Sequence, residues 1–155
     1  MKKFLHILIL VLSLVFIPFS NVYAIESNST YTYIEEKFDD GSYFEITIDY
    51  GNLNARTSIT KSKTATYKGE DGTALWSVTV KGTFTYNGST STCTSSSVST
   101  KNYSTTWKLS NATSSKSGAT ASASVTAKQY HSNGTVLRTI NKTVKLTCDK
   151  NGNLS

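Results

Sequence analysis

Residues 74–88, Ala-Leu-Trp-Ser-Val-Thr-Val-Lys-Gly-Thr-Phe-Thr-Tyr-Asn-Gly, decide the fold class of this chain. Nearly every second side chain is apolar, and these side chains are Trp76, Val78, Val80, Phe84 and Tyr86. Because successive side chains of a strand point to opposite faces, the alternation predicts a half-buried β-strand over Thr73–Tyr86. Gly82 interrupts the apolar row, which indicates a bulge or a bulky neighbour lying over the strand. Asn87-Gly88 is typical of a hairpin turn, so a return strand is expected over Ser89–Val98.

Upstream of this segment, the same two-residue period predicts a hairpin. Its arms are Tyr31–Phe38 and Tyr43–Tyr50, and Gly41 is expected to take the positive-φ position of the turn between them. The polar stretch from Asn52 to Lys68 alternates only weakly, so we expect a polar edge strand there.

Downstream, Tyr103–Leu109 is expected to be a short strand and Ser110–Gly118 a loop. A row of small residues follows, at Ala119, Ala121, Ala123, Val125 and Ala127. Such a row leaves space for aromatic side chains from a facing sheet, with Trp76, Phe84 and Trp107 as candidates. In the last strand, Thr135–Cys148, the cations Arg138 and Lys142 share the parity of the apolar residues. We therefore expect the first half of that strand to reach past the core.

These elements add up to an all-β fold. The pattern predicts an antiparallel β-sandwich, or a closed β structure, of about 7–8 strands, and no helical period follows residue 24. The side chains predicted to form its core are Trp76, Val78, Val80, Phe84, Trp107, Val144 and Leu146.

Residues 1–24 have the organisation of a secretory signal peptide helix. Two lysines precede an apolar run over residues 5–19, and small residues favour cleavage between Ala24 and Ile25. An uncleaved membrane anchor is the alternative, but a span needs about 20 apolar residues. The expected product, residues 25–155, suits a single domain that is secreted and either released or loosely held at the cell surface. In this view only the signal peptide meets a membrane.

The chain has two cysteines, Cys93 and Cys148. In an oxidising compartment such a pair predicts a disulfide, which would staple a core over residues 73–148. On a chain-entropy model this bond would stabilise the fold by about 4 kcal/mol.

Charge is strongly segregated along the chain. Residues 25–49 hold seven acids against one lysine, within an acidic N-terminal hairpin over residues 25–50, whereas residues 50–155 hold three acids against 13 Lys and Arg. Three interpretations stay open: the acidic hairpin packs on a basic face of its own domain, the basic part meets an anionic envelope polymer or phospholipid surface, or the charges are simply solvated. Nucleic acid is not an expected partner, because the basic residues form no cluster.

The order Cys93, Trp107, Cys148 resembles a constant-type immunoglobulin domain, in which a disulfide packs against a tryptophan. The chain departs from that pattern, because Leu146 stands where a tyrosine is expected and only seven residues follow Cys148. A second resemblance rests on residues 74–88, on Thr92-Cys-Thr-Ser-Ser-Ser97 and on the ending from Leu146 to Ser155. These segments are similar to small secreted proteins of Gram-positive bacteria with no established activity. The resemblance implies a compartment and a β fold, and no functional residue.

Catalytic and metal-binding patterns are not found. The chain after residue 24 has one histidine, His131, which lies beside the expected Asn133-Gly134 turn and lacks a nucleophile partner. The adjacent carboxylates Glu35 and Glu36 would point to opposite faces of a strand, whereas Asp39-Asp40 and Glu70-Asp71 fit turn chemistry. We therefore expect no enzyme, no metal and no cofactor.

The leading hypothesis is a secreted, non-enzymatic β-sandwich that acts as a binding module at or outside the cell envelope. Its partner would be an anionic envelope polymer, a glycan or another protein. If exposed, the tyrosines Tyr31, Tyr33, Tyr43 and Tyr50 could stack on sugars, although aromatic residues in strands are more often structural. The alternative is a small bacteriocin-like or membrane-active toxin that uses the alanine-rich hairpin after residue 118.

Overall fold

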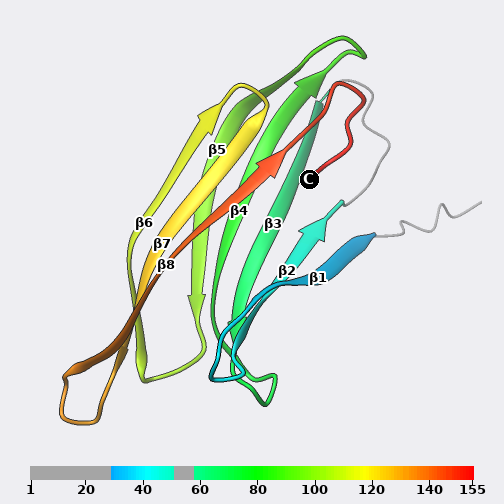
Figure 1. Ribbon diagram of the computed structural model, residues 1–155. Coiled ribbons are helices and arrows are strands. Elements are labelled where there is room, and N and C mark those ends of the chain that lie inside the picture. Colours follow the sequence, from blue (N-terminus) through cyan, green and yellow to red (C-terminus); the bar gives the residue numbers. More distant parts are fainter. Residues whose placement is uncertain (1–28, 51–57) are drawn as a thin grey trace, which may run out of the picture.

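The computed structural model describes residues 29–50 and 58–155. Eight antiparallel strands form two sheets there, and the described residues contain no helix. The strands are β1 (Thr30–Lys37), β2 (Tyr43–Asp49), β3 (Ser58–Lys68), β4 (Ala74–Tyr86), β5 (Ser91–Asn102), β6 (Trp107–Ser117), β7 (Thr120–Tyr130) and β8 (Val136–Thr147). Figure 1 shows the two sheets facing each other. The prediction of an all-β sandwich is confirmed, whereas the signal segment and the Ala24–Ile25 cleavage site lie outside the described residues.

The strand order corrects the immunoglobulin resemblance. It is β1-β2-β3-β4-β5 in the five-stranded sheet and β6-β7-β8 in the three-stranded sheet, so each sheet is a simple meander. An immunoglobulin domain instead interleaves strands that are distant in sequence through Greek-key connections. Short turns join β1 to β2, β3 to β4, β4 to β5, β6 to β7 and β7 to β8, and such connections favour the meander observed here.

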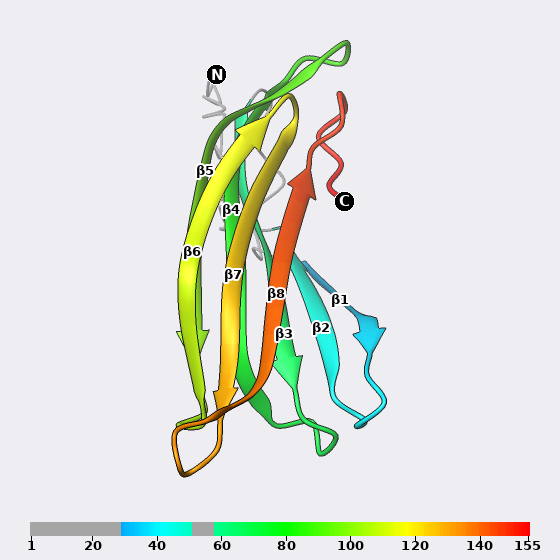
Figure 2. The same ribbon diagram turned by 60° about the vertical axis from the view of Figure 1, so that its left-hand side comes forward.

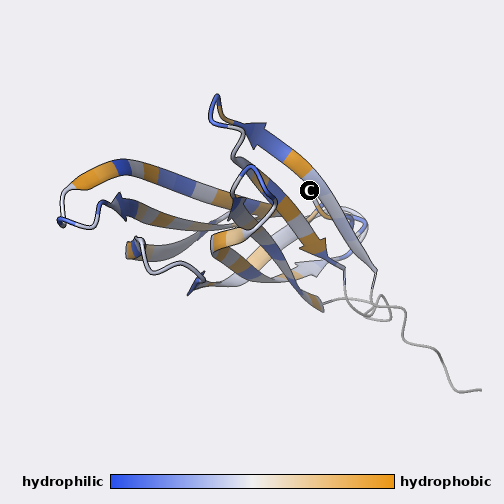
Figure 3. Ribbon diagram, turned by 90° about the horizontal axis from the view of Figure 1, so that it is seen from below, coloured by the Kyte–Doolittle hydropathy of each residue, from blue (hydrophilic) through white to orange (hydrophobic). Residues whose placement is uncertain are grey.

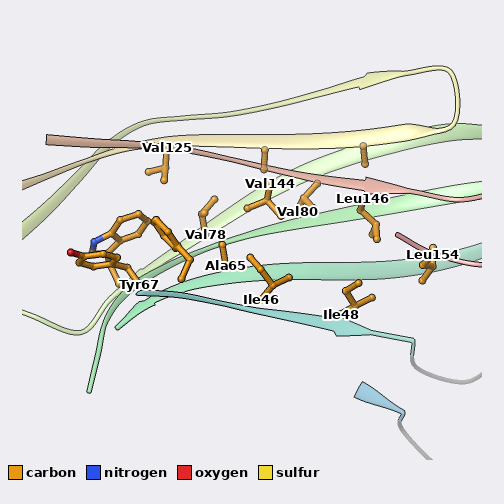
Figure 4. Packing of buried hydrophobic residues seen from close by; sticks show 14 of the residues in the cluster. Ile46, Ile48, Ala65, Tyr67, Val78, Val80, Val125, Val144, Leu146 and Leu154 are labelled. Atoms are coloured by element: carbon orange, nitrogen blue, oxygen red, sulfur yellow. The ribbon is translucent and has the colours of Figure 1, made fainter. Parts of the chain in front are cut away.

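Strand β4 lies between β3 and β5 and organises the core. All seven side chains that the sequence places in the core are buried, each at most 3% exposed. Figure 3 shows the hydrophobic and hydrophilic residues alternating along the strands, and Figure 4 shows the apolar side chains of both sheets meeting between them. Alternating patterns of this kind bury one face of each sheet and leave the other polar.

Gly82 is the one gap in the apolar row of β4, and the ring of Phe84 lies over it. A Cβ atom at residue 82 would come within 2.6 Å of that ring and 2.8 Å of the Ala121 Cβ atom on β7. A bulge also follows, because Thr83 pairs with Ser95 whereas Phe84 pairs with Cys93. Both expectations for Gly82, a bulky neighbour and a bulge, are therefore confirmed. The bulge places its additional residue on β5.

Three segments differ from the expectation. The strand expected over Tyr103–Leu109 begins only at Trp107, after a turn. Ser58–Lys68 is a strand, but it is central rather than at an edge, and its inward row includes the buried Lys61 and Lys63. These lysines weaken the apolar alternation. The loop expected over Ser110–Gly118 is instead the second half of β6, interrupted by a bulge where Asn111 has a φ of 53°. Hydroxyl side chains line this edge strand, so main-chain pairing with β7 holds it without an apolar pattern.

The two sides of the sandwich are closed differently. At the β5–β6 side, side chains bond to main-chain carbonyls across the gap: Lys116 Nζ donates to Thr94 O at 2.7 Å, and Ser114 Oγ donates to Ser96 O at 3.3 Å. At the other side, β1 and β2 diverge from β8 (Figure 2). Among the described residues, the side chain of Lys142 and the segment after β8 reach the inner face of β1 and β2.

The predicted disulfide is wrong for this structure. Cys93 at the start of β5 and Cys148 just after β8 are both buried free thiols. Main-chain bonds hold both strands to the β6–β7 turn instead, since Cys93 N–H donates to Gly118 O at 2.8 Å and Cys148 N–H donates to Ala119 O at 3.1 Å. Hydrogen bonds to the consecutive carbonyls of Gly118 and Ala119 thus take the place of the disulfide inferred from the sequence.

Both thiols are expected to be inert in the native protein. Burial raises the pKa of Cys93 and of Cys148, which keeps the thiols protonated and poorly nucleophilic. A thiol reagent should therefore label neither cysteine at neutral pH and should label both after unfolding without a reductant. An unfolded, unreduced chain whose cysteines stay unlabelled and whose mass is lower by two hydrogen atoms would contradict the free-thiol state.

Candidate binding surfaces

His131 and Asp71, two of the residues that suggested chemistry in the sequence, lie in turns of the structure. His131 is exposed in the β7–β8 turn. Asp71 accepts hydrogen bonds from the main chain and hydroxyl of Thr73 at 2.9 and 2.8 Å. No group of three or more His, Cys, Asp or Glu within the described ranges could hold a metal ion.

Glu35 and Glu36 converge on one cation, contrary to the expectation that they face opposite sides. The pairing of β1 with β2 shifts register between Ile34 and Glu36, so a bulge breaks the alternation there. Lys142 Nζ on β8 then lies 2.5 Å from Glu35 Oε2 and 3.7 Å from Glu36 Oε2. The same Nζ lies 4.0 Å from the centre of the Phe44 ring. A buried lysine therefore joins the acidic hairpin to the three-stranded sheet.

Arg138 makes a second connection across the open side. Its Nη1 donates to Asp40 Oδ2 at 2.6 Å and to the Tyr67 hydroxyl at 2.7 Å. The hydrogen bond from the Ser42 hydroxyl, with a further contribution from Arg138, lowers the pKa of Asp40. Burial raises the pKa of Tyr67.

These two cations correct the expectation for the last strand. Lys142 is buried inside the sandwich, and Arg138, whose side chain is 27% exposed, covers its open side rather than reaching past it. Val136 and Leu137, before them in β8, are exposed. The acidic hairpin therefore packs on basic residues of its own domain, as the first interpretation of the charge pattern holds. Pairing and aromatic contacts allow both cations to lie in this position.

The exposed side of the three-stranded sheet is a candidate polyanion surface, which we call the basic face. It carries Lys108, Lys128 and Lys145 among hydroxyl side chains. The chain has no Asp or Glu from residue 72 to residue 148. Within residues 29–50 and 58–155, none of these three lysines forms an ion pair. Figure 2 shows this sheet in front of the five-stranded sheet.

The open side of the sandwich holds a second candidate, which we call the tyrosine cleft. It has a volume of about 400 Å³. Its lining residues are Tyr31, Tyr33, Ile48, Tyr50, Lys63, Leu154 and Ser155. Three of the four tyrosines predicted as a stacking platform thus come together, whereas Tyr43 pairs with Lys68 on the other face of the sheet. Sequence reasoning missed Lys63, whose one available signal is the parity that it shares with Ile59 and Tyr67.

A third hollow lies on the outer face of the five-stranded sheet. It has a volume of about 490 Å³ and is lined by hydroxyl side chains together with Asp49, Lys61 and Lys81. Nearby hydroxyls bond to one another, as between Thr64 and Thr79 at 2.8 Å and between Thr60 and Thr83 at 2.9 Å. These cross-strand bonds engage two of the lining hydroxyls, those of Thr60 and Thr79, in stabilising the sheet.

Comparisons of the chain with protein-family models, curated proteins and solved structures give no match. No helix among the described residues is long and apolar enough to cross a membrane.

Proposed function

We propose that the protein is a secreted, non-enzymatic binding module that attaches to an anionic polymer of the cell envelope through its basic face. The observation that carries the proposal is charge: residues of the three-stranded sheet include six Lys and Arg and no acid. Two of these cations, Arg138 and Lys142, are neutralised internally. The three on the basic face are left for an external anion.

The placement of Lys108 and Lys128 supports an anionic ligand. They are direct partners across β6 and β7, so their like charges oppose each other on one face. Such a pair destabilises a sheet by roughly 0.2–1 kcal/mol unless an anion lies between the charges. Lys108 also lies over the ring of Tyr130, with Nζ 5.1 Å from its centre.

The rest of the face suits an extended polymer. Lys145 of β8 pairs with Ser122 of β7. Ser122 lies six residues along β7 from Lys128, so Lys145 and Lys128 are separated by roughly 20 Å along the strand. Between them, cross-strand bonds fix the hydroxyls, with Ser124 Oγ and Thr143 Oγ1 2.9 Å apart and Thr126 Oγ1 donating to Asn141 Oδ1 at 2.8 Å. Several units of a polyanion can therefore contact lysines at both ends and hydroxyls in between.

The membrane-active alternative gains no support from the packing. The alanine row of β7 is at most 2% exposed, because it faces the core. Presenting this row to lipid would require the two sheets to separate.

The test is binding of long-chain polyphosphate to protein purified from the medium of a secreting host. Removing both opposed lysines, in the variant K108T/K128T, should weaken binding by about 30-fold, taking about 1 kcal/mol for each lysine near an anionic surface. Affinity should also fall steeply with salt concentration, because binding releases counterions.

The matched control is K81T/K101T, which removes the same charge from the outer face of the five-stranded sheet. It should change the affinity by less than about threefold, given the distance of these residues from the bound polymer. Equal losses in both double variants, or equal binding of uncharged dextran, would show that the basic face is not the site.

A further inference from the structure

We propose that the tyrosine cleft is a separate binding site for a sugar ring that carries a carboxylate or phosphate group. The site lies on the inner face of β1–β3, away from the basic face, and its argument does not rest on the proposed function.

The cleft exists because the two sheets differ in width. Tyr31 of β1 pairs with Ile48 of β2, and Ile48 pairs with Lys63 of β3, so one row crosses the inner face of the sheet. The three-stranded sheet does not extend over β1 (Figure 2). The segment after β8 covers part of it, since Leu154 is 9% exposed and lies near Ile48 (Figure 4).

Lys63 is the feature that calls for an anion. Its side chain is buried, with 9% exposure, and it lines the cleft. No residue in the described part of the chain gives it a hydrogen bond or an ion pair. Lys142, which is equally buried, has two carboxylates. The stem of Lys63 is buried while its Nζ atom keeps contact with solvent, so an anionic ligand in the cleft can reach the ammonium and supply the partner that it lacks.

The walls of the cleft suit a sugar ring. Tyr31 is 57% exposed, and its ring centre lies 5.6 Å from that of Tyr33 at an interplanar angle of 35°. Open tyrosine rings offer an apolar face for the C–H side of a sugar and a hydroxyl for its polar edge. The volume of about 400 Å³ lies at the small end of ligand sites, so one or two sugar units would fit.

The experiment is an NMR titration of protein purified from the medium of a secreting host. The probes are glucuronate, glucose 6-phosphate, glucose and inorganic phosphate. Both charged sugars should shift the signals of Tyr31, Tyr33 and Lys63, whereas glucose and phosphate alone should bind at least tenfold more weakly. Whichever charged sugar binds more tightly identifies the preferred anion. Absence of shifts at these residues with both charged sugars overturns the proposal.

Two variants separate the roles of charge and stacking. Lys63→Met removes the charge but keeps a long unbranched side chain, and it should reduce the affinity for charged sugars to that for glucose. Tyr31→Ala, at an exposed position, should weaken the binding of all sugars by about tenfold, because it removes an apolar ring face on which the sugar stacks. Tyr103→Ala removes another exposed tyrosine, 48% exposed, and should have no effect.

The variant K108T/K128T separates this site from the basic face. It should lose polyphosphate binding and keep sugar binding, so either proposal can fail alone. If Lys63→Met binds charged sugars as tightly as the parent protein does, Lys63 does not bind the anionic group, and the proposal is overturned.

Discussion

Replacing Trp107 with alanine is expected to lower the free energy of unfolding by about 3–5 kcal/mol, a large share of the roughly 5–15 kcal/mol that stabilises a small domain. Trp107 is 2% exposed. Its ring centre lies 5.2 Å from Tyr67 and 5.9 Å from Trp76, both on the opposite sheet. The other buried apolar side chains of its own sheet are Ala, Val and Leu, which cannot fill the space. Urea denaturation should show a midpoint lower by roughly 2 M, for an m value of about 2 kcal/mol/M.

Two variants control this measurement. Trp107→Phe should lose less stability, since Trp107 Nε1 has no hydrogen-bond partner among the described residues and a phenyl ring keeps part of the aromatic contact. Tyr103→Ala, on the surface, should stay within about 0.5 kcal/mol of the parent. A Trp107→Ala protein that unfolds at the parent midpoint would show that the ring does not join the two sheets.

Gly82→Val is expected to have the second large effect. A Cβ atom at this position would lie 2.6 Å from the Phe84 ring and 2.8 Å from the Ala121 Cβ atom, so even Gly82→Ala is overpacked. Overpacking of a core costs about 1–3 kcal/mol, whereas alanine in place of glycine inside an open strand would add roughly 0.5–1 kcal/mol of stability. The loss should increase from alanine to valine. Thermal and urea unfolding of both variants measure it.

The contact with Phe84 supplies the control for Gly82. Phe84→Leu shortens the side chain over residue 82, so the double variant G82A/F84L should lose less stability than the sum of the two single variants. Simple additivity would mean that Phe84 does not limit the space above Gly82.

The strands that sequence reasoning placed well are those with strict alternation. In β4 the apolar row from Trp76 to Phe84 makes the direction of every side chain clear, and Gly41 and Gly88 mark turns where φ is 76° and 83°. The alternation failed where polar residues occupy inward positions. Lys61 and Lys63 made the central β3 resemble an edge, and the hydroxyls of β6 made its second half resemble a loop.

The candidate sites were predictable only in part. The excess of basic residues after residue 50 left an anion-binding surface as one of three interpretations, because local sequence does not say which cations are paired. The bulge after Ile34 turns both Glu35 and Glu36 toward Lys142, and alternation alone predicts the opposite. In the sequence Lys63 resembles any other polar strand residue, and only the pairing of β1, β2 and β3 places it beside the tyrosines.

By itself, the sequence determined the all-β class, most strand positions and turns, and the apolar set of the core, because these follow from the two-residue period and from glycine at positive φ. The tertiary structure alone decided the assignment of strands to sheets, the free state of Cys93 and Cys148, and the pairing of Arg138 and Lys142 with the acidic hairpin. These features depend on contacts between residues far apart in the chain. The tertiary structure also decided the unequal width of the two sheets, which leaves an open cleft lined by Lys63.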